Sequence, residues 1–203
     1  MNDSRDHILT TSLKLFLQKS FKEVTMKEIV EHTGLSKGAF YHYFTSKEQV
    51  FMEVINHFFR EYLHEDYSQL PTESLAGFYQ SILVNLDRRN EGAFFTSTGE
   101  PNDEEAFNIN HYYLLFDAIR MLPAFKQKQL DHQQEEFASW TTVVTKARSN
   151  GEIRSAMTDE QIAKLFIYLS DGVGINYVMT EGLSKVRQEL QSLWDGLYNT
   201  LKD

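Results

Sequence analysis

The sequence predicts an all-α protein, and three observations lead to that fold class. Apolar side chains recur at the three- and four-residue spacing of amphipathic helices along most of the 203 residues. Only three prolines and ten glycines are present, which argues against a turn-rich β protein. Segments such as "TMKE" and "SKEQ" have the pattern of helix capping boxes. With an apolar fraction of 41%, the chain has enough material for a packed core of about nine helices.

The first helices in the prediction are short and closely spaced. Residues 8–17 carry the apolar stripe of a first helix, which ends near residue 20. Thr25 is placed to cap the second helix, with Glu28 completing a capping box, and Gly34 is placed to end it. Ser36 begins the third helix, "SKGAFYHYF", and Ser46 begins a longer one that continues to about residue 65.

Helical spacing continues through the rest of the chain with less sharply marked ends. Residues 90–105 are rich in turn formers and acids, so we expect an irregular segment there. The remaining helices are expected from Thr72 or Ser74 to about residue 89 and then over 106–122, 125–149, 158–182 and 184–201.

Composition excludes several classes of protein. The chain has no cysteine, so disulfides and thiolate metal sites are ruled out. Its start, "MNDSRDHIL", lacks the apolar run of a signal peptide, and no segment approaches the roughly 20 apolar residues that span a bilayer. We therefore expect a cytoplasmic protein that does not engage a membrane.

The net charge of −9 is unevenly distributed. Residues 1–47 carry seven Lys or Arg against five Asp or Glu, a net charge of +2. Residues 48–203 carry the other 13 basic and 24 acidic side chains, a net charge of −11. A basic N-terminal segment on an acidic body indicates that the N-terminal segment meets a polyanion.

The second and third helices, joined by the turn "HTGLS", have the layout of a helix-turn-helix. In such a unit the N-terminal residues of the second helix enter the major groove of DNA. Lys37 is placed to reach a guanine edge or a phosphate, while Gly38 and Ala39 let the backbone approach closely. Phe40 and Phe44, four residues apart, are expected to pack against the preceding helices.

Residues 8–50 resemble the DNA-binding domain of the tetracycline-repressor (TetR/AcrR) family of bacterial transcription regulators. The matching residues are Leu15-Phe16 in the first helix, Thr25, Ile29, "TGLSKGAFYHYF" and "SKEQVF". The resemblance implies a DNA-binding domain over 1–47 and an effector-binding and dimerisation domain over 48–203. It also implies contacts to phosphates or the major groove from Thr25, Ser36, Lys37, Gly38, Ala39, Tyr41, His42 and Lys47.

A homodimer follows from the same resemblance, which implies that the last two helices form a four-helix interface with those of a second copy. A two-fold dimer also suits a palindromic operator in double-stranded DNA. The expected interface residues pack inward or across that interface and are Ile162, Leu165, Phe166, Leu169, Val173, Tyr177, Leu193, Trp194 and Leu197.

Aromatic side chains in the second domain have two interpretations: plain core, or the lining of a pocket for an apolar or aromatic small-molecule effector. The candidates, with polar neighbours that would orient a ligand, are Phe78, Tyr79, Phe94, Phe95, Asn110, His111, Tyr112, Tyr113, Phe116, Trp140, Thr141 and Tyr168. The same resemblance implies that binding there would shift the long helix that follows Ser46 and release DNA, as in a repressor. A ligand that tightens DNA binding is equally allowed by linkage. A helical small-molecule-binding protein and a ligand-dependent activator with the same DNA-binding segment remain as alternatives.

No catalytic constellation or nucleotide-binding loop stands out, so we expect neither enzyme activity nor a cofactor. His57, Glu61 and His64 have a helical spacing that suits zinc. A solvated helix face is the simpler interpretation of these three residues, and no metal site is predicted.

Overall fold

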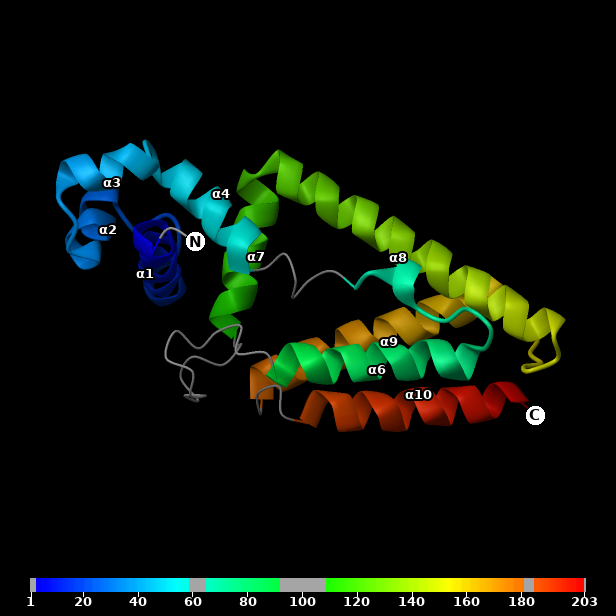
Figure 1. The fold of residues 1–203 in the computed structure, drawn as a ribbon. Coiled ribbons are helices and arrows are strands. Elements are labelled where there is room, and N and C mark those ends of the chain that lie inside the picture. Colours follow the sequence, from blue (N-terminus) through cyan, green and yellow to red (C-terminus); the bar gives the residue numbers. More distant parts are fainter. Residues whose placement is uncertain (1–2, 59–64, 92–108, 181–184, 203) are drawn as a thin grey trace. The chain divides into compact units, whose positions relative to one another are not determined.

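The computed structural model describes residues 3–58, 65–91, 109–180 and 185–202 of the chain. Within these residues there are nine α-helices, one short 3-10 helix and no strand, which confirms the all-α prediction (Figure 1). None of the described helices is both long and apolar enough to cross a bilayer. The elements are α1 (Asp3–Lys19), α2 (Met26–Thr33), α3 (Lys37–Tyr43), α4 (Lys47–Phe58), η1 (Tyr67–Gln69), α6 (Leu75–Glu91), α7 (Ile109–Met121), α8 (Pro123–Ser149), α9 (Asp159–Thr180) and α10 (Val186–Lys202).

Capping side chains set the start of several helices where the sequence predicts them. The hydroxyl of Thr158 accepts from the backbone N–H of Gln161 at 3.2 Å, and the Gln161 side chain accepts from the N–H of Thr158 at 2.9 Å, so this capping box is complete. Thr25 likewise accepts from the N–H of Glu28 at 3.2 Å. The Glu28 carboxylate, however, accepts from Lys19 at the end of α1 instead of closing the box.

Packing divides the chain into two compact units. Unit 1 comprises Met1–Leu63 and Asn108–Gln127, and unit 2 comprises His64–Phe107 and Lys128–Asp203. Unit 1 therefore contains α1 to α4 and α7, whereas unit 2 contains α6, α9, α10 and most of α8. By packing, α4 belongs with the N-terminal helices, whereas the functional division after residue 47 stays a prediction.

Aromatic packing explains why α4 belongs to unit 1. The ring of Phe51 in α4 lies 5.3 Å from that of Phe16 in α1 and 4.6 Å from that of Phe21, between ring centroids. All three side chains are buried, and such pairs contribute beyond their burial alone. α7 packs against α1 and α4 and buries Leu114 and Leu115.

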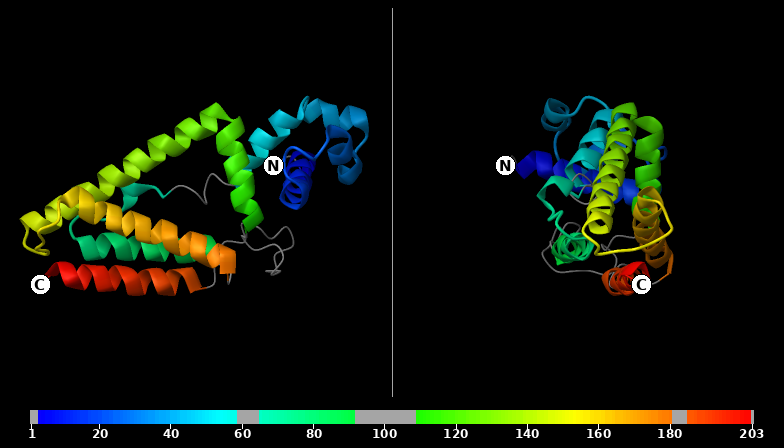
Figure 2. Two further views of the ribbon diagram at one scale, coloured as in Figure 1. Left: turned by 180° about the vertical axis from the view of Figure 1, so that it is seen from behind. Right: turned by 90° about the vertical axis from the view of Figure 1, so that its right-hand side faces the viewer.

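The core of unit 2 is a cluster of stacked aromatic rings. Helices α6, α9 and α10 lie side by side, as both views of Figure 2 show. Trp140 of α8 stacks on Phe166 of α9 at 4.8 Å and meets Phe78 of α6 edge-on at 4.9 Å. Trp194 of α10 completes the cluster 5.4 Å from Trp140, and its indole N–H donates to the carbonyl of Phe166 at 3.0 Å.

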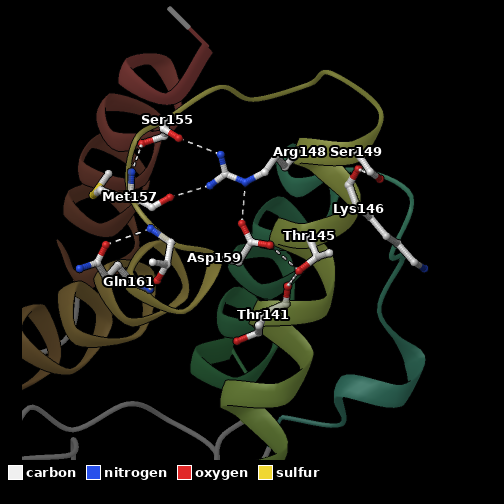
Figure 3. A network of polar contacts seen from close by, with 10 residues as sticks. Thr141, Thr145, Lys146, Arg148, Ser149, Ser155, Met157, Asp159 and Gln161 are labelled. Carbon is white, nitrogen blue, oxygen red and sulfur yellow. Dashed lines mark hydrogen bonds and ion pairs between the residues drawn. The ribbon is translucent and has the colours of Figure 1, made fainter.

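An arginine holds the connection between α8 and α9 (Figure 3). The guanidinium of Arg148 donates to the carboxylate of Asp159 at 2.7 Å and to the carbonyls of Ser155 and Met157 at 2.8 and 2.7 Å. Thr145, one turn before Arg148, donates to the second oxygen of Asp159 at 2.7 Å. These hydrogen bonds hold the pKa of Asp159 below its usual value; the bond from Thr145 has the largest effect and the bond from Arg148 the next largest.

Candidate nucleic-acid interface

The turn between α2 and α3 has the geometry that its sequence predicts. Gly34 ends α2 in the left-handed conformation, with φ 65°, and its N–H donates to the carbonyl of Glu31. Ser36 caps α3, because its hydroxyl accepts from the N–H of Ala39 at 3.3 Å. Two residues therefore separate the end of one helix from the cap of the next, which is the tight connection of a helix-turn-helix.

One side of this unit is exposed. Ser36, Lys37, Gly38 and Ala39 at the start of α3 are all exposed to solvent, and Gly38 has open space where a side chain would begin. Among the described residues Lys37 forms no ion pair, so its ammonium is available to an anionic ligand. The other predicted DNA contacts that are exposed are Thr25, Tyr41 and His42.

The opposite side of α3 is buried and fixes its orientation. Phe40 and Phe44 have 0% and 1% of their surface exposed, and Ile29 of α2 is also fully buried. Both phenylalanines are therefore buried, as their predicted packing role requires. A helix anchored by two large apolar side chains can present its other face to a ligand with little reorganisation.

Lys47 differs from the other predicted contacts, because its ammonium faces the protein. Nζ donates to the backbone carbonyls of Phe21 at 2.8 Å and Val24 at 2.7 Å, with that of Lys22 at 3.5 Å. It also lies 4.4 Å from the centre of the Phe21 ring. The sequence gives no signal for this arrangement, since the carbonyls lie 23 to 26 residues earlier in the chain.

The predicted effector residues are divided between the two units. Phe78, Tyr79 and Trp140 are buried in the core of unit 2, which supports the plain-core interpretation for these three. In unit 2, Tyr168 is 62% exposed, while the Thr141 hydroxyl donates to a carbonyl of its own helix. Five others belong to α7 of unit 1, and Phe94 and Phe95 lie outside the described residues; the five are Asn110, His111, Tyr112, Tyr113 and Phe116.

The predicted interface residues of α9 and α10 fall into three groups. Four of them are buried in the core of unit 2: Ile162, Phe166, Val173 and Trp194. Another three are partly buried against that core: Leu169, Tyr177 and Leu197. Only two are exposed, at 39% and 37%: Leu165 and Leu193.

The exposed face of α9 contains apolar residues beyond the predicted interface set. Ile175 and Met179 are 46% and 65% exposed, and they continue a line that includes Leu165 and Tyr168. The spacing 165, 168, 172, 175 and 179 is that of a heptad seam. The heptad period is the sequence feature that marks this seam, but it is hard to recognise because α9 carries apolar residues on most of its circumference.

The structure describes only one of the three residues whose spacing suits zinc. Glu61 and His64 lie outside the described residues, and His57 is on α4. Within the described ranges, no three His, Cys, Asp or Glu side chains are grouped to hold a metal ion.

Comparison with known proteins identifies the N-terminal segment. Residues 8–54 match the family described as bacterial regulatory proteins, tetR family. The HTH-type transcriptional regulator YerO of Bacillus subtilis (strain 168) is 40% identical over 58 residues. That alignment spans 29% of this chain and 20% of YerO, so the chain matches only about a fifth of the length of this relative.

Two further similarities extend over most of the chain. The HTH-type transcriptional repressor AcnR of Corynebacterium efficiens is 26% identical over 191 residues, which is 91% of this chain and 88% of that protein. The crystal structure of a transcriptional regulator from Aquifex aeolicus VF5 superposes with a TM-score of 0.58 and 20% identity, covering 98% of this chain and 99% of that one. The second similarity concerns the fold, a helix-turn-helix unit followed by a helical domain.

Proposed function

Because the chain belongs to the tetR family of bacterial regulatory proteins, we propose that it binds a palindromic DNA operator as a homodimer and represses transcription until a small molecule releases it. It is a transcription regulator and not an enzyme, as its relatives are named regulators and repressors. This role requires access to the chromosome and places the chain in the cytoplasm.

The observation that carries the proposal is the exposed start of α3 on a buried apolar support. Lys37 lies in the first turn, where its ammonium can reach a guanine edge or a phosphate. Gly38 and Ala39 leave room for the backbone to approach the groove and for a thymine methyl group. Phe40 and Phe44 hold this surface in place before DNA arrives, which lowers the ordering cost of binding.

The flanking residues supply contacts that position the protein without reading sequence. Thr25 caps α2 and is exposed; its hydroxyl oxygen accepts from the N–H of Glu28, so the hydroxyl hydrogen is left to donate to a phosphate. Ser36 occupies the same place at the start of α3. Tyr41 and His42 are exposed beside α3, where their polar tips can donate to the DNA backbone.

We assign the homodimer interface chiefly to the exposed seam of α9. Leu165, Tyr168, Ile175 and Met179 are between 39% and 65% exposed, and they follow one line along the helix. Gly172 interrupts this line of large side chains and lets a second helix approach closely. A seam of this period pairs with its own copy in a helical bundle, and Leu193 of α10 extends the patch.

The effector is proposed to be an apolar or aromatic small molecule. Among the candidate residues of α7, Tyr113 and Phe116 are 61% and 58% exposed, which leaves them available to a ligand. Binding would favour a conformer in which α4 is displaced, and α4 follows directly on the DNA-binding helices. A ligand can release DNA only to the extent that it prefers that conformer.

The test is the affinity of variants for the duplex that the wild-type chain enriches from a random pool. Lys37→Ala and Tyr41→Ala should each weaken binding about ten-fold or more, with helix content and dimer mass unchanged. Lys128→Ala, an exposed lysine of unit 2, serves as a matched control and should bind normally. Unchanged affinity in both α3 variants would show that this surface does not contact DNA.

A further inference from the structure

We propose that Lys47 is a positioning residue of the DNA-binding surface, whose ammonium joins the start of α4 to the turn that precedes α2. The proposal rests on the DNA-binding function proposed above. It assigns to Lys47 a role different from the phosphate contact that the family resemblance implies.

The ammonium of Lys47 makes two short hydrogen bonds and one long one to backbone carbonyls. A lysine ammonium has three N–H groups, and three carbonyl oxygens lie at 2.7, 2.8 and 3.5 Å from Nζ. Such charge-assisted hydrogen bonds are stronger than neutral ones. The face of the Phe21 ring, 4.4 Å away, adds a cation–π contact.

The turn that accepts these bonds is sharply curled. Ser20 has a φ of 77°, an uncommon conformation for a residue with a side chain, and its carbonyl accepts from the N–H of Val24 at 3.4 Å. This reversal gathers the carbonyls of Phe21, Lys22 and Val24 around one point. Phe21 and Val24 are themselves buried, so the turn is anchored in the core of unit 1.

The contacts between Lys47 and the turn formed by residues 20–24, called the Lys47 clamp below, join the two helix starts that flank α3 in the chain. Val24 directly precedes Thr25, the cap of α2. Lys47 is the first residue of α4, and Ser46 caps that helix by accepting from the N–H of Gln49 at 3.1 Å. Holding Lys47 on the turn therefore fixes the spacing between the N-terminal N–H groups of α2 and those of α4. Helix α3 lies between these two helices in the chain.

A phosphate contact through the same ammonium would compete with these carbonyls for its N–H groups. Each bond to a backbone carbonyl satisfies a polar group that is partly removed from water. Lys37, by comparison, is exposed and needs no such exchange. Lys47 therefore acts on DNA affinity through geometry, and Lys37 acts through contact.

Thermal melting and salt dependence separate the two roles. Lys47→Met should lower the Tm of the chain by roughly 4–8 °C, whereas Lys22→Met, which removes an exposed charge from the same turn, should change it by less than about 1 °C. Lys47→Met should also weaken binding to the enriched duplex about ten-fold, with an unchanged slope of log K against log salt. A Tm equal to that of wild type, together with a slope reduced by about 0.9, would identify a phosphate contact and overturn the proposal.

A measurement on the unmodified chain keeps the test independent of whether the variant folds. The ¹⁵N-detected ammonium signal of Lys47, assigned by its loss in Lys47→Arg, should be visible in the free protein because its protons are held by carbonyls. The chemical shift of this signal should not change when the duplex is added. An ammonium signal that becomes visible only with DNA would overturn the proposal. Failure to enrich any duplex would refute DNA binding itself, while the Tm and the free-protein signal would still decide whether the clamp exists.

Discussion

Replacing Arg148 with methionine should destabilise unit 2 by an amount that its contacts set. The guanidinium makes three bonds of 2.7 to 2.8 Å, to Asp159, Ser155 and Met157. Hydrogen bonds to charged groups contribute about 1.5–3 kcal/mol each when shielded from water. The Arg148 side chain is 33% exposed, so solvent screening reduces each contribution to about 1 kcal/mol. The expected loss in the free energy of unfolding is therefore about 2–4 kcal/mol.

Urea unfolding followed by tryptophan fluorescence measures this loss selectively. The chain has two tryptophans, Trp140 and Trp194, and both are buried in the core of unit 2. Arg148→Met should lower the urea midpoint with an unchanged m value. Lys146→Met, on the same helix, removes one exposed bond to Thr72 and should change stability by less than about 0.5 kcal/mol. If the two variants lose equal stability, the assignment of Arg148 as the clamp of the α8–α9 connection is refuted.

The pH dependence of Asp159→Asn gives an independent check on the same network. Hydrogen bonds from Thr145 and Arg148 lower the pKa of Asp159 in the folded chain. Its stabilising effect is therefore complete above the unfolded pKa of about 3.9 and is lost as the pH falls through the lower folded value. The difference in unfolding free energy between wild type and Asp159→Asn should be constant from about pH 7 to 5 and shrink below about pH 4.

Three further outcomes follow from single residues. Gly34→Ala should lower the free energy of unfolding by about 1 kcal/mol, because φ is 65° there. Gly38→Ala, in the open first turn of α3, should raise the Tm but weaken DNA binding, because it places a methyl group in the groove. Thermal melting by circular dichroism and gel-shift titration measure both variants, and equal Tm changes would contradict the argument. Burial and the hydrogen bond to Glu152 raise the pKa of Tyr198 to about 12. The contribution of the neutral phenol is therefore complete below about pH 10 and lost between about pH 10 and 12, and urea midpoints of Tyr198→Phe should fall less over that interval than those of wild type. Tyr168→Glu, in the exposed seam of α9, should shift the dimer toward monomer in sedimentation equilibrium, whereas Glu160→Gln on the same helix should not.

Local chemistry made much of the fold predictable. Thr25 and Ser36 each cap a helix where the sequence places one, because an N-cap is decided by residues three positions apart. The exposed start of α3 and its buried underside were predictable for the same reason, since Phe40 and Phe44 repeat at helical spacing.

Long-range contacts account for what the sequence did not reveal. The start of α6 is capped by Glu152, whose carboxylate accepts from the N–H groups of Leu75 and Ala76 at 3.0 and 3.1 Å across more than 70 residues. The carbonyls that hold Lys47 are similarly remote. For α9, apolar residues occupy most of the surface, so only the packing of neighbouring helices shows which of them are left exposed.

Selection from a random duplex pool by the purified full chain tests the central claim most directly. A two-fold dimer that presents two copies of α3 should enrich an inverted repeat, with half-sites about one helical turn apart, and Lys37→Ala should lose that enrichment. Enrichment of no sequence, or of a single unpaired half-site, would contradict a dimeric operator-binding regulator.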